Sequence, residues 1–107
     1  MSSEKKSCCG VPNCCDMRGM LQFLIMWILS QKSLYGSQIA DEIGRRRGDR
    51  PNPGTIYPAL KELLNRGIIN FELEGNRKLY SLTSLGKSAL DSCKTWFIQA
   101  FGDILKI

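Results

Sequence analysis

Residues 53–82 read PGTIYPALKELLNRGIINFELEGNRKLYSL, and this stretch decides the fold. Apolar residues in its first half recur at the i, i+4, i+7 and i+8 spacing of one helix face: Ile56, Leu60, Leu63 and Leu64. Asn52 is a good N-cap and Gly67 a good C′ residue, so we expect a helix that begins shortly after Asn52 and ends near Arg66. Pro58 lacks an N–H and is tolerated only in the first turn of a helix, which favours a start near Gly54.

The second half of the stretch has the alternating pattern of two β-strands. Apolar residues from Ile69 to Leu73 alternate with polar ones, Gly75-Asn76 follows, and the alternation resumes up to Leu82. Glycine supplies the positive φ that a two-residue hairpin turn requires at its first central position. We therefore expect a two-stranded β-hairpin directly after the helix.

Two more helices are expected before this stretch. From Met17 to Ser30 the chain is apolar nearly all round, which is typical of a helix buried on most sides. After a polar break at residues 31–36, a second helix with a narrow apolar face is expected from about Gly36 to Arg45. Residues 44–53 contain two Gly and two Pro and are expected to form a loop.

A long helix is expected from the N-cap Thr83 to near the C-terminus. Its apolar stripe comprises Leu85, Ala89, Leu90, Cys93, Trp96, Phe97, Ala100, Phe101, Ile104 and Leu105. This stripe is too long and wide for so small a domain to cover, so we expect the last turns to pack against a second copy of the chain. The alternative is that the helix folds back on the first helix of its own chain. Cys93 falls on the apolar face, where a small buried thiol needs no function.

The order helix, helix, helix, hairpin, helix is that of a winged helix-turn-helix. The expected fold class is mainly α with a two-stranded β-hairpin and a long C-terminal dimerisation helix. We expect a flexible Cys-rich arm over residues 1–16, a winged-helix DNA-binding domain over 17–82 and the dimerisation helix over 83–107. In this geometry the third helix lies in the major groove of DNA, and the hairpin, or wing, touches the backbone or minor groove.

Composition narrows the range of functions. Fifteen Lys and Arg against ten Asp and Glu leave a net charge of +5 on 107 residues, which favours a polyanionic partner, although a mildly basic protein without one fits equally. The sequence has no His, which excludes a Ser–His–Asp triad, a Cys–His pair and a His-ligated metal. With no paired-carboxylate or glycine-rich phosphate motif either, we predict that the protein is not an enzyme.

The N-terminal residues show no apolar signal segment. The longest apolar run, from Phe23 to Leu29, is far shorter than the roughly 20 residues that cross a bilayer. We therefore expect a cytoplasmic protein with no membrane partner.

The polar face of the third helix suits DNA. Thr55 lies in the first turn, where its hydroxyl and the free N–H groups can meet a phosphate. Tyr57 and Lys61 project together one turn apart; Lys61 can reach a phosphate or a guanine edge, and Tyr57 a phosphate or sugar. Arg77 and Lys78 lie beside the wing turn, as phosphate contacts would.

An arginine-rich run precedes the third helix: Arg45, Arg46, Arg47 and Arg50. We expect Arg47 and Arg50 to grip the DNA backbone from the other side. Each assignment has an alternative. The arginines could be surface charge or ion-pair partners of Asp41 and Glu42, Tyr57 could be a core aromatic, and Lys61 beside Glu62 could belong to a solvated face.

These segments resemble a known family. Residues 54–61 (GTIYPALK) and 64–69 (LNRGII) resemble the recognition-helix signature of the PadR family of transcriptional regulators. Residues 77–86 (RKLYSLTSLG) resemble that family's wing and the start of its fourth helix, and residues 35–40 (YGSQIA) resemble its second helix. The likeness covers about residues 19–107.

The resemblance implies a dimeric, repressor-type regulator that binds double-stranded DNA at a pseudo-palindromic operator, with the C-terminal helices in contact across the two-fold axis. It also implies an effector, often a small aromatic compound, that weakens DNA binding. In some multidrug-binding relatives a Trp on the last helix forms a flat platform for ligands. Trp96 is similarly placed, with a position in the core as the alternative. The wing is short, and the chain ends with the last helix, as in the small subgroup of the family.

The N-terminal arm is not part of the family motif. It holds four cysteines in eight residues: Cys8, Cys9, Cys14 and Cys15. Four thiolates can bind zinc or an iron–sulfur cluster, although this spacing differs from the usual C-x2-C knuckle. Redox sensing by a disulfide within the arm and an inert tail are the alternatives. The second functional hypothesis is therefore a metal- or redox-responsive protein whose winged helix is a protein-interaction scaffold.

Overall fold

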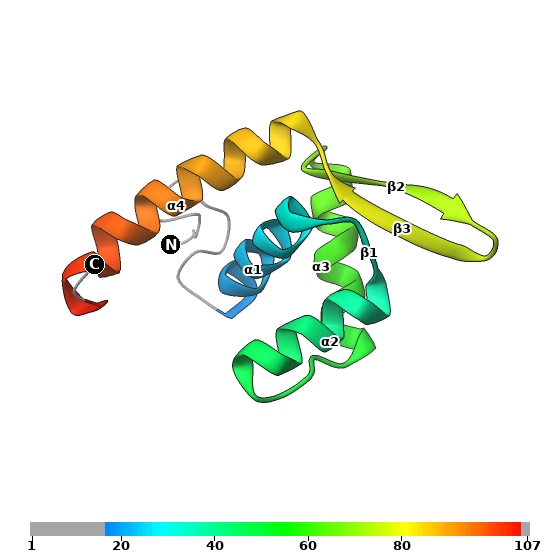
Figure 1. Ribbon diagram of the computed structural model, residues 1–107, viewed down its shortest axis with the longest axis horizontal. Helices are drawn as coiled ribbons and strands as arrows, with labels where there is room; N and C mark the ends of the chain where they lie inside the picture. The colour runs from blue at the N-terminus through cyan, green and yellow to red at the C-terminus, as the bar shows by residue number, and fades with distance from the viewer. Residues whose placement is uncertain (1–16, 106–107) are drawn as a thin grey trace, which may run out of the picture.

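The computed structural model describes the backbone of residues 17–105 and the side chains of residues 20–105. The elements follow one another as α1 (Met17–Gln31), β1 (Leu34–Tyr35), α2 (Gly36–Arg47), α3 (Pro53–Asn65), β2 (Ile69–Glu74), β3 (Arg77–Leu82) and α4 (Ser84–Leu105). The hairpin of β2 and β3 projects from one end of the molecule, and α4 runs over α1 towards the opposite end (Figure 1). The predicted fold, mainly α with a hairpin between the third and fourth helices, is confirmed.

The core is built around α1, which contacts α2, α3, α4 and β3. This explains why its sequence is apolar on nearly every side. The most deeply buried side chains come from the first three helices and the first residue of β2: Leu21, Ile25, Ile39, Ile43, Ile56, Leu60, Leu63 and Ile69. Burial of such side chains is the main favourable term in folding, and it fixes the direction in which the outer face of α3 points.

The sheet has three antiparallel strands in the order β1-β3-β2. The sequence predicted the two hairpin strands but placed Leu34 and Tyr35 in a polar break. These residues instead form β1, in which Leu34 pairs with Tyr80 and Tyr35 with Leu79. A strand of two residues has no alternation to recognise, and its partner lies more than forty residues further along the chain.

The ends of α2 and α3 are set by glycine and proline. Gly48 adopts φ +91° and donates to the Gly44 carbonyl, so α2 extends to Arg47, two residues beyond the predicted end. Helix α3 begins at Pro53, one residue before the predicted start, and Pro58 therefore lies in its second turn. The bond that Pro58 cannot make is to the carbonyl of Gly54, an exposed residue in the first turn, whose oxygen water can satisfy.

The C-terminal end of α3 follows the prediction. Gly67 has φ +75° and donates to the Leu64 carbonyl, while Ile68 donates to the Leu63 carbonyl. These two bonds form a Schellman motif, which needs the left-handed conformation at Gly67. The carbonyls of Gly67 and Ile68 also accept hydrogen bonds from Thr83, just before α4.

Thr83 joins the start of α4 to the end of α3. Its N–H donates to the Ile68 carbonyl at 3.0 Å, and its hydroxyl lies 2.6 Å from the Gly67 carbonyl and 2.9 Å from that of Ile68. The hydroxyl also accepts the N–H of Gly86 at 3.0 Å, which makes Thr83 the predicted N-cap. A β carbon at Gly86 would lie 2.1 Å from the Ile68 oxygen, so only glycine allows α4 to lie this close.

The apolar stripe of α4 is divided between its own chain and solvent. Leu90 and Cys93 are buried, and Phe97 packs on Phe23 of α1 with the ring centroids 5.6 Å apart. For this part of the stripe the alternative of folding back on the first helix is correct. Other residues of α4 are at least half exposed: Leu85, Ile98, Ile104 and Leu105.

Candidate nucleic-acid interface

The outer face of α3 presents the three residues that the sequence assigned to DNA. Thr55, Tyr57 and Lys61 are exposed, whereas Ile56 and Leu60 between them are buried. Tyr57 is 47% exposed, which excludes the alternative that it is a core aromatic. The buried stripe of α3 thus turns its polar side chains outwards as one row.

The two wing cations stack on aromatic rings. The Arg77 guanidinium carbon lies 3.7 Å from the centre of the Tyr35 ring, and the Lys78 ammonium lies 4.7 Å from that of Phe71. Both cationic side chains are exposed. A cation held over a ring has fewer conformations than a free one but keeps its charge available to solvent or to a phosphate.

Tyr35 also anchors the end of β2. Its hydroxyl donates to the Glu74 carboxylate at 2.5 Å, and this bond raises the pKa of Tyr35 because the neighbouring carboxylate disfavours a phenolate. Glu74 pairs with Arg77 across the hairpin. One tyrosine of β1 therefore contacts both strands next to the wing turn, and this fixes the wing relative to the start of α2.

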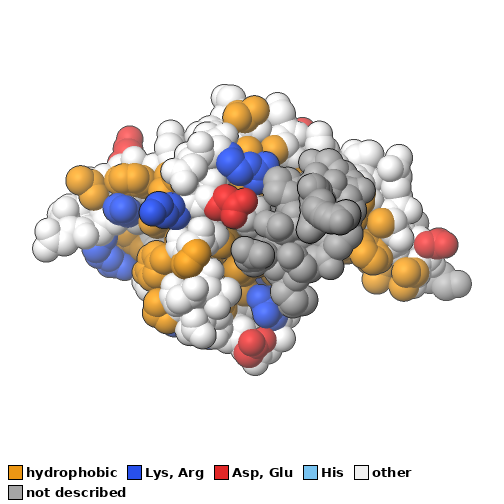
Figure 2. Space-filling model, turned by 180° about the vertical axis from the view of Figure 1, so that it is seen from behind, with side chains coloured by type: hydrophobic (Ala, Val, Ile, Leu, Met, Phe, Trp, Pro, Cys, Tyr) orange, Lys and Arg blue, Asp and Glu red, His pale blue; other side chains and the backbone are white. Residues whose placement is uncertain are grey.

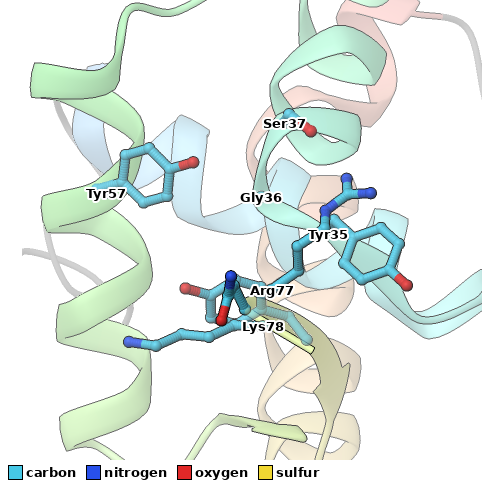
Figure 3. Close-up of a pocket in the computed structure, with 8 residues that line it drawn as sticks. Tyr35, Gly36, Ser37, Tyr57, Arg77 and Lys78 are labelled. Carbon is cyan, nitrogen blue, oxygen red and sulfur yellow. The ribbon is translucent and has the colours of Figure 1, made fainter. Parts of the chain in front are cut away.

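A cavity of about 340 Å³ lies where α2, α3 and the wing meet. It is lined by Tyr35, Gly36, Ser37, Tyr57, Asn76, Arg77, Lys78 and Tyr80. Tyr57 projects from α3 towards the start of α2, and Lys78 reaches from β3 towards α3 (Figure 3). Tyr80 is buried, and its pKa is raised first by that burial and then by the nearby Tyr57. The cavity thus lies between α3, the candidate recognition helix, and the hairpin, the candidate wing.

Three of the four residues in the arginine run form ion pairs with carboxylates of α2. Arg45 and Arg46 both contact the Glu42 carboxylate, whose pKa is lowered chiefly by the hydrogen bond from Arg45. Arg50 lies 2.6 Å from Asp41, so the ion-pair alternative holds for these three arginines. Arg47 is exposed and has no ion pair with the part of the chain that the structure describes.

Hydrophobic side chains accompany the cations at the wing. Phe71 and Leu73 lie on the same face of the hairpin as Lys78 and Tyr80, and Leu73 is 66% exposed. Figure 2 shows Lys and Arg side chains interleaved with hydrophobic ones at the end of the molecule formed by the hairpin. Such a surface suits the sugars and phosphates of a nucleic-acid backbone.

The other residues that the sequence singled out are the four N-terminal cysteines, Trp96 and Cys93. Cys8, Cys9, Cys14 and Cys15 lie outside the described residues. Within residues 20–105, no three His, Cys, Asp or Glu side chains gather as a metal site. Trp96 is half-buried and packs edge-on against Phe101 of its own chain, with the ring centroids 5.7 Å apart. Cys93 is buried, as predicted, and burial raises the pKa of its thiol.

Sequence reasoning missed three residues of the interface: Gly36, Tyr35 and Glu74. The first two belonged to the resemblance at residues 35–40, so that signal was present without a physical role attached to it. Glu74 gave no signal, because its partner stands 39 residues away in the sequence. None of the described helices combines the length and apolar character that crossing a bilayer requires.

Comparison with known proteins agrees with this geometry. Residues 25–92 match the model of the transcriptional regulator PadR-like family. The chain is similar to a PadR-like transcription factor of Bacteroides fragilis, at 29% identity over 83% of this chain and 90% of that one, with a TM-score of 0.73. RosR of H. salinarum is 30% identical over 76% of this chain and 74% of that chain, with a TM-score of 0.68. An uncharacterised protein of Lysinibacillus sphaericus is 31% identical over 88 residues, which cover 75% of this chain and 81% of that protein.

Proposed function

The chain belongs to the PadR-like family of transcriptional regulators, and we propose that it is a repressor that binds a specific DNA sequence as a homodimer in the cytoplasm. The observation that carries the proposal is the meeting of α3 and the wing at one cavity, with Tyr57 on one side and Arg77 and Lys78 on the other. A winged helix binds DNA with that helix in the major groove and the wing on the backbone. The family is one of regulators, which fits the prediction that the chain is not an enzyme.

We assign the DNA contacts according to whether each side chain is exposed and whether an ion pair already holds it. Thr55, Tyr57 and Lys61 would face the major groove and its flanking phosphates, and Arg77 and Lys78 the backbone beside it. Arg47 is exposed and available for a phosphate. Arg50 would have to leave Asp41, since the two side chains are paired in the free protein.

The homodimer is supported by the exposed part of the α4 stripe. Ile104 is 70% exposed and Leu105 is 50% exposed. Large exposed apolar side chains on one helix mark an interaction surface, and a two-fold axis is the commonest way for a chain to cover its own surface. A small aromatic effector that binds near Trp96 and weakens DNA binding remains part of the proposal.

Selection of binding sites from a library of random duplexes tests the specificity. We expect a pseudo-palindrome whose half-sites lie about one helical turn apart. Recovery of no common sequence would contradict a sequence-specific regulator. Replacing both Lys61 and Arg77 by Ala should weaken binding and reduce the salt slope by about 3.6, because each of the two subunits loses two phosphate contacts and each contact contributes about 0.9. Lys94→Ala on α4 is the matched control, and an unchanged slope in the double variant would contradict the assigned interface.

Analytical ultracentrifugation tests the dimer. Ile104→Glu and Leu105→Glu each place a charge on the exposed apolar face and should give a monomer with the far-UV circular dichroism of the wild type. Gln99→Glu adds the same charge at an exposed polar position and should remain a dimer. A dimer that survives both Glu substitutions would show that this face of α4 does not form the interface.

A further inference from the structure

Gly36 is the first residue of α2 and is buried against Tyr57. A β carbon at position 36 would lie 3.0 Å from Cε1 of Tyr57, 3.1 Å from its hydroxyl oxygen and 3.4 Å from Cζ. The three nearest atoms all belong to this one tyrosine. Even the smallest side chain at this position would therefore push against the phenol ring.

The backbone does not require glycine at this position. Positive φ angles occur at Gly48, Gly67 and Gly75, and Gly36 is not among them. Alanine is the better helix former, so local stability would favour Ala at the start of α2. The contact with Tyr57 is thus the feature of the structure that explains Gly36.

Tyr57 needs such a contact because the core does not hold it. Its side chain is exposed on the outer face of α3, and its ring lies between α3 and the start of α2, at the cavity that Lys78 and Arg77 also line (Figure 3). A flat ring against a bare Cα fixes the direction of its hydroxyl. With a methyl group at position 36, the ring would turn away from α2.

We propose that Gly36 is a positioning residue for DNA recognition: its missing side chain lets Tyr57 lie against α2, with its hydroxyl on the Gly36 side of the cavity that Lys78 also lines. The group that the hydroxyl recognises is a backbone phosphate of the duplex, to which a phenol can donate a hydrogen bond. The inference rests on the proposed function and adds to it a residue that does not itself touch DNA.

A double-mutant cycle tests this coupling. The probe is a 25-base-pair duplex carrying the selected operator, and binding is followed by fluorescence anisotropy at one salt concentration. Gly36→Ala and Tyr57→Phe should each weaken binding of the dimer roughly hundredfold, because each of the two subunits loses one hydrogen bond to a charged group, an effect of roughly tenfold per subunit. In a Tyr57→Ala background, Gly36→Ala should cause no further loss, because the added methyl group then meets no ring.

Thermal unfolding, and NMR of the protein without DNA, provide a second test. The midpoint of thermal unfolding of Gly36→Ala should equal or exceed that of the wild type, since alanine favours the helix. The NMR signals of the Tyr57 ring should shift in the free variant, without any DNA present.

Four results would count against the proposal. Equal losses from Gly36→Ala in both backgrounds, or a lowered unfolding midpoint, would give Gly36 a general structural role and overturn it. Wild-type affinity in Gly36→Ala, while Tyr57→Ala binds weakly, would overturn this inference and leave the proposed function standing. A wild-type protein that binds no duplex would overturn both.

Discussion

Replacing Gly86 by Ala should destabilise the fold at the joint between α3 and α4. The new β carbon would lie 2.1 Å from the Ile68 oxygen, 2.7 Å from Cδ1 of Leu82 and 3.0 Å from its Cγ. A comfortable carbon–oxygen contact is about 3.3 Å or longer, so the start of α4 must move by more than an ångström. The Ile68 oxygen cannot retreat, because it already accepts the N–H of Thr83 at 3.0 Å.

The expected loss is about 2 kcal/mol of unfolding free energy. Overpacking of this kind costs about 1–3 kcal/mol, and weakening the Thr83 cap adds about 1 kcal/mol. The helix preference of alanine over glycine returns about 1 kcal/mol. For a domain of this size the net loss corresponds to a melting temperature lower by about 10 °C.

Urea unfolding at a fixed protein concentration measures the effect, because dimerisation makes the midpoint depend on concentration. Gly102→Ala is the matched control on the same helix: its β carbon would meet only Cγ2 of Ile98, at an ordinary 3.5 Å. We expect the control to be neutral or slightly stabilising. A Gly86→Ala variant as stable as the control would refute the close approach of α4 to Ile68.

Substitutions at three further positions test the electrostatics. Asp41→Asn should release Arg50 in both subunits, giving tighter binding to a random-sequence duplex and a salt slope steeper by up to about 1.8; an unchanged slope would mean that Arg50 does not reach DNA. Tyr35→Phe keeps the ring under Arg77 but loses the bond to Glu74, so it should weaken operator binding by up to about threefold, against about tenfold for Tyr35→Leu; equal affinities would argue against Tyr35 as the anchor of the wing. Burial raises the pKa of the Cys93 thiol above its ordinary 9.0, so its contribution to stability is complete below pH 9 and declines as the pH rises through the folded value. Cys93→Ala should therefore lose less unfolding free energy between pH 8 and pH 10 than the wild type in urea titrations, and parallel declines would contradict this.

The parts of the fold that the sequence predicted are those that local chemistry controls. The periodicity of α3, the Gly67 cap, the Gly75-Asn76 turn and the Thr83 cap each depend on residues within one or two turns. Strand β1 was missed because it exists only through its pairing with β3. Its two residues carry no pattern of their own.

The sequence singled out Tyr57, Arg77 and Lys78 of the candidate site, but it did not predict the contacts of these residues with the rest of the site. Tyr57 and Lys78 could be assigned to DNA from the helix and hairpin patterns, but their meeting at one cavity depends on the packing of α3 against the sheet. A run of arginines can face DNA or a carboxylate on its own helix, and only the loop geometry pairs Arg50 with Asp41. The sequence left both alternatives open, and the structure decides between them only for the free protein.

The hydrogen bonds at Gly67 and Ile68 form a joint between α3, the candidate recognition helix, and α4, the helix proposed to form the dimer. The Schellman motif that ends α3 and the cap that begins α4 both use residues 67–68, so the two helix ends are hydrogen-bonded to each other directly. In a dimer held through α4, the separation of the two α3 helices is therefore set by this joint as well as by the α4 contact. DNA half-sites have a fixed spacing of about 34–36 Å, so even a small rotation at the joint misplaces one α3 helix. An effector that shifts α4 would weaken DNA binding by this route without touching α3, because the carbonyls of Gly67 and Ile68 couple the two helices.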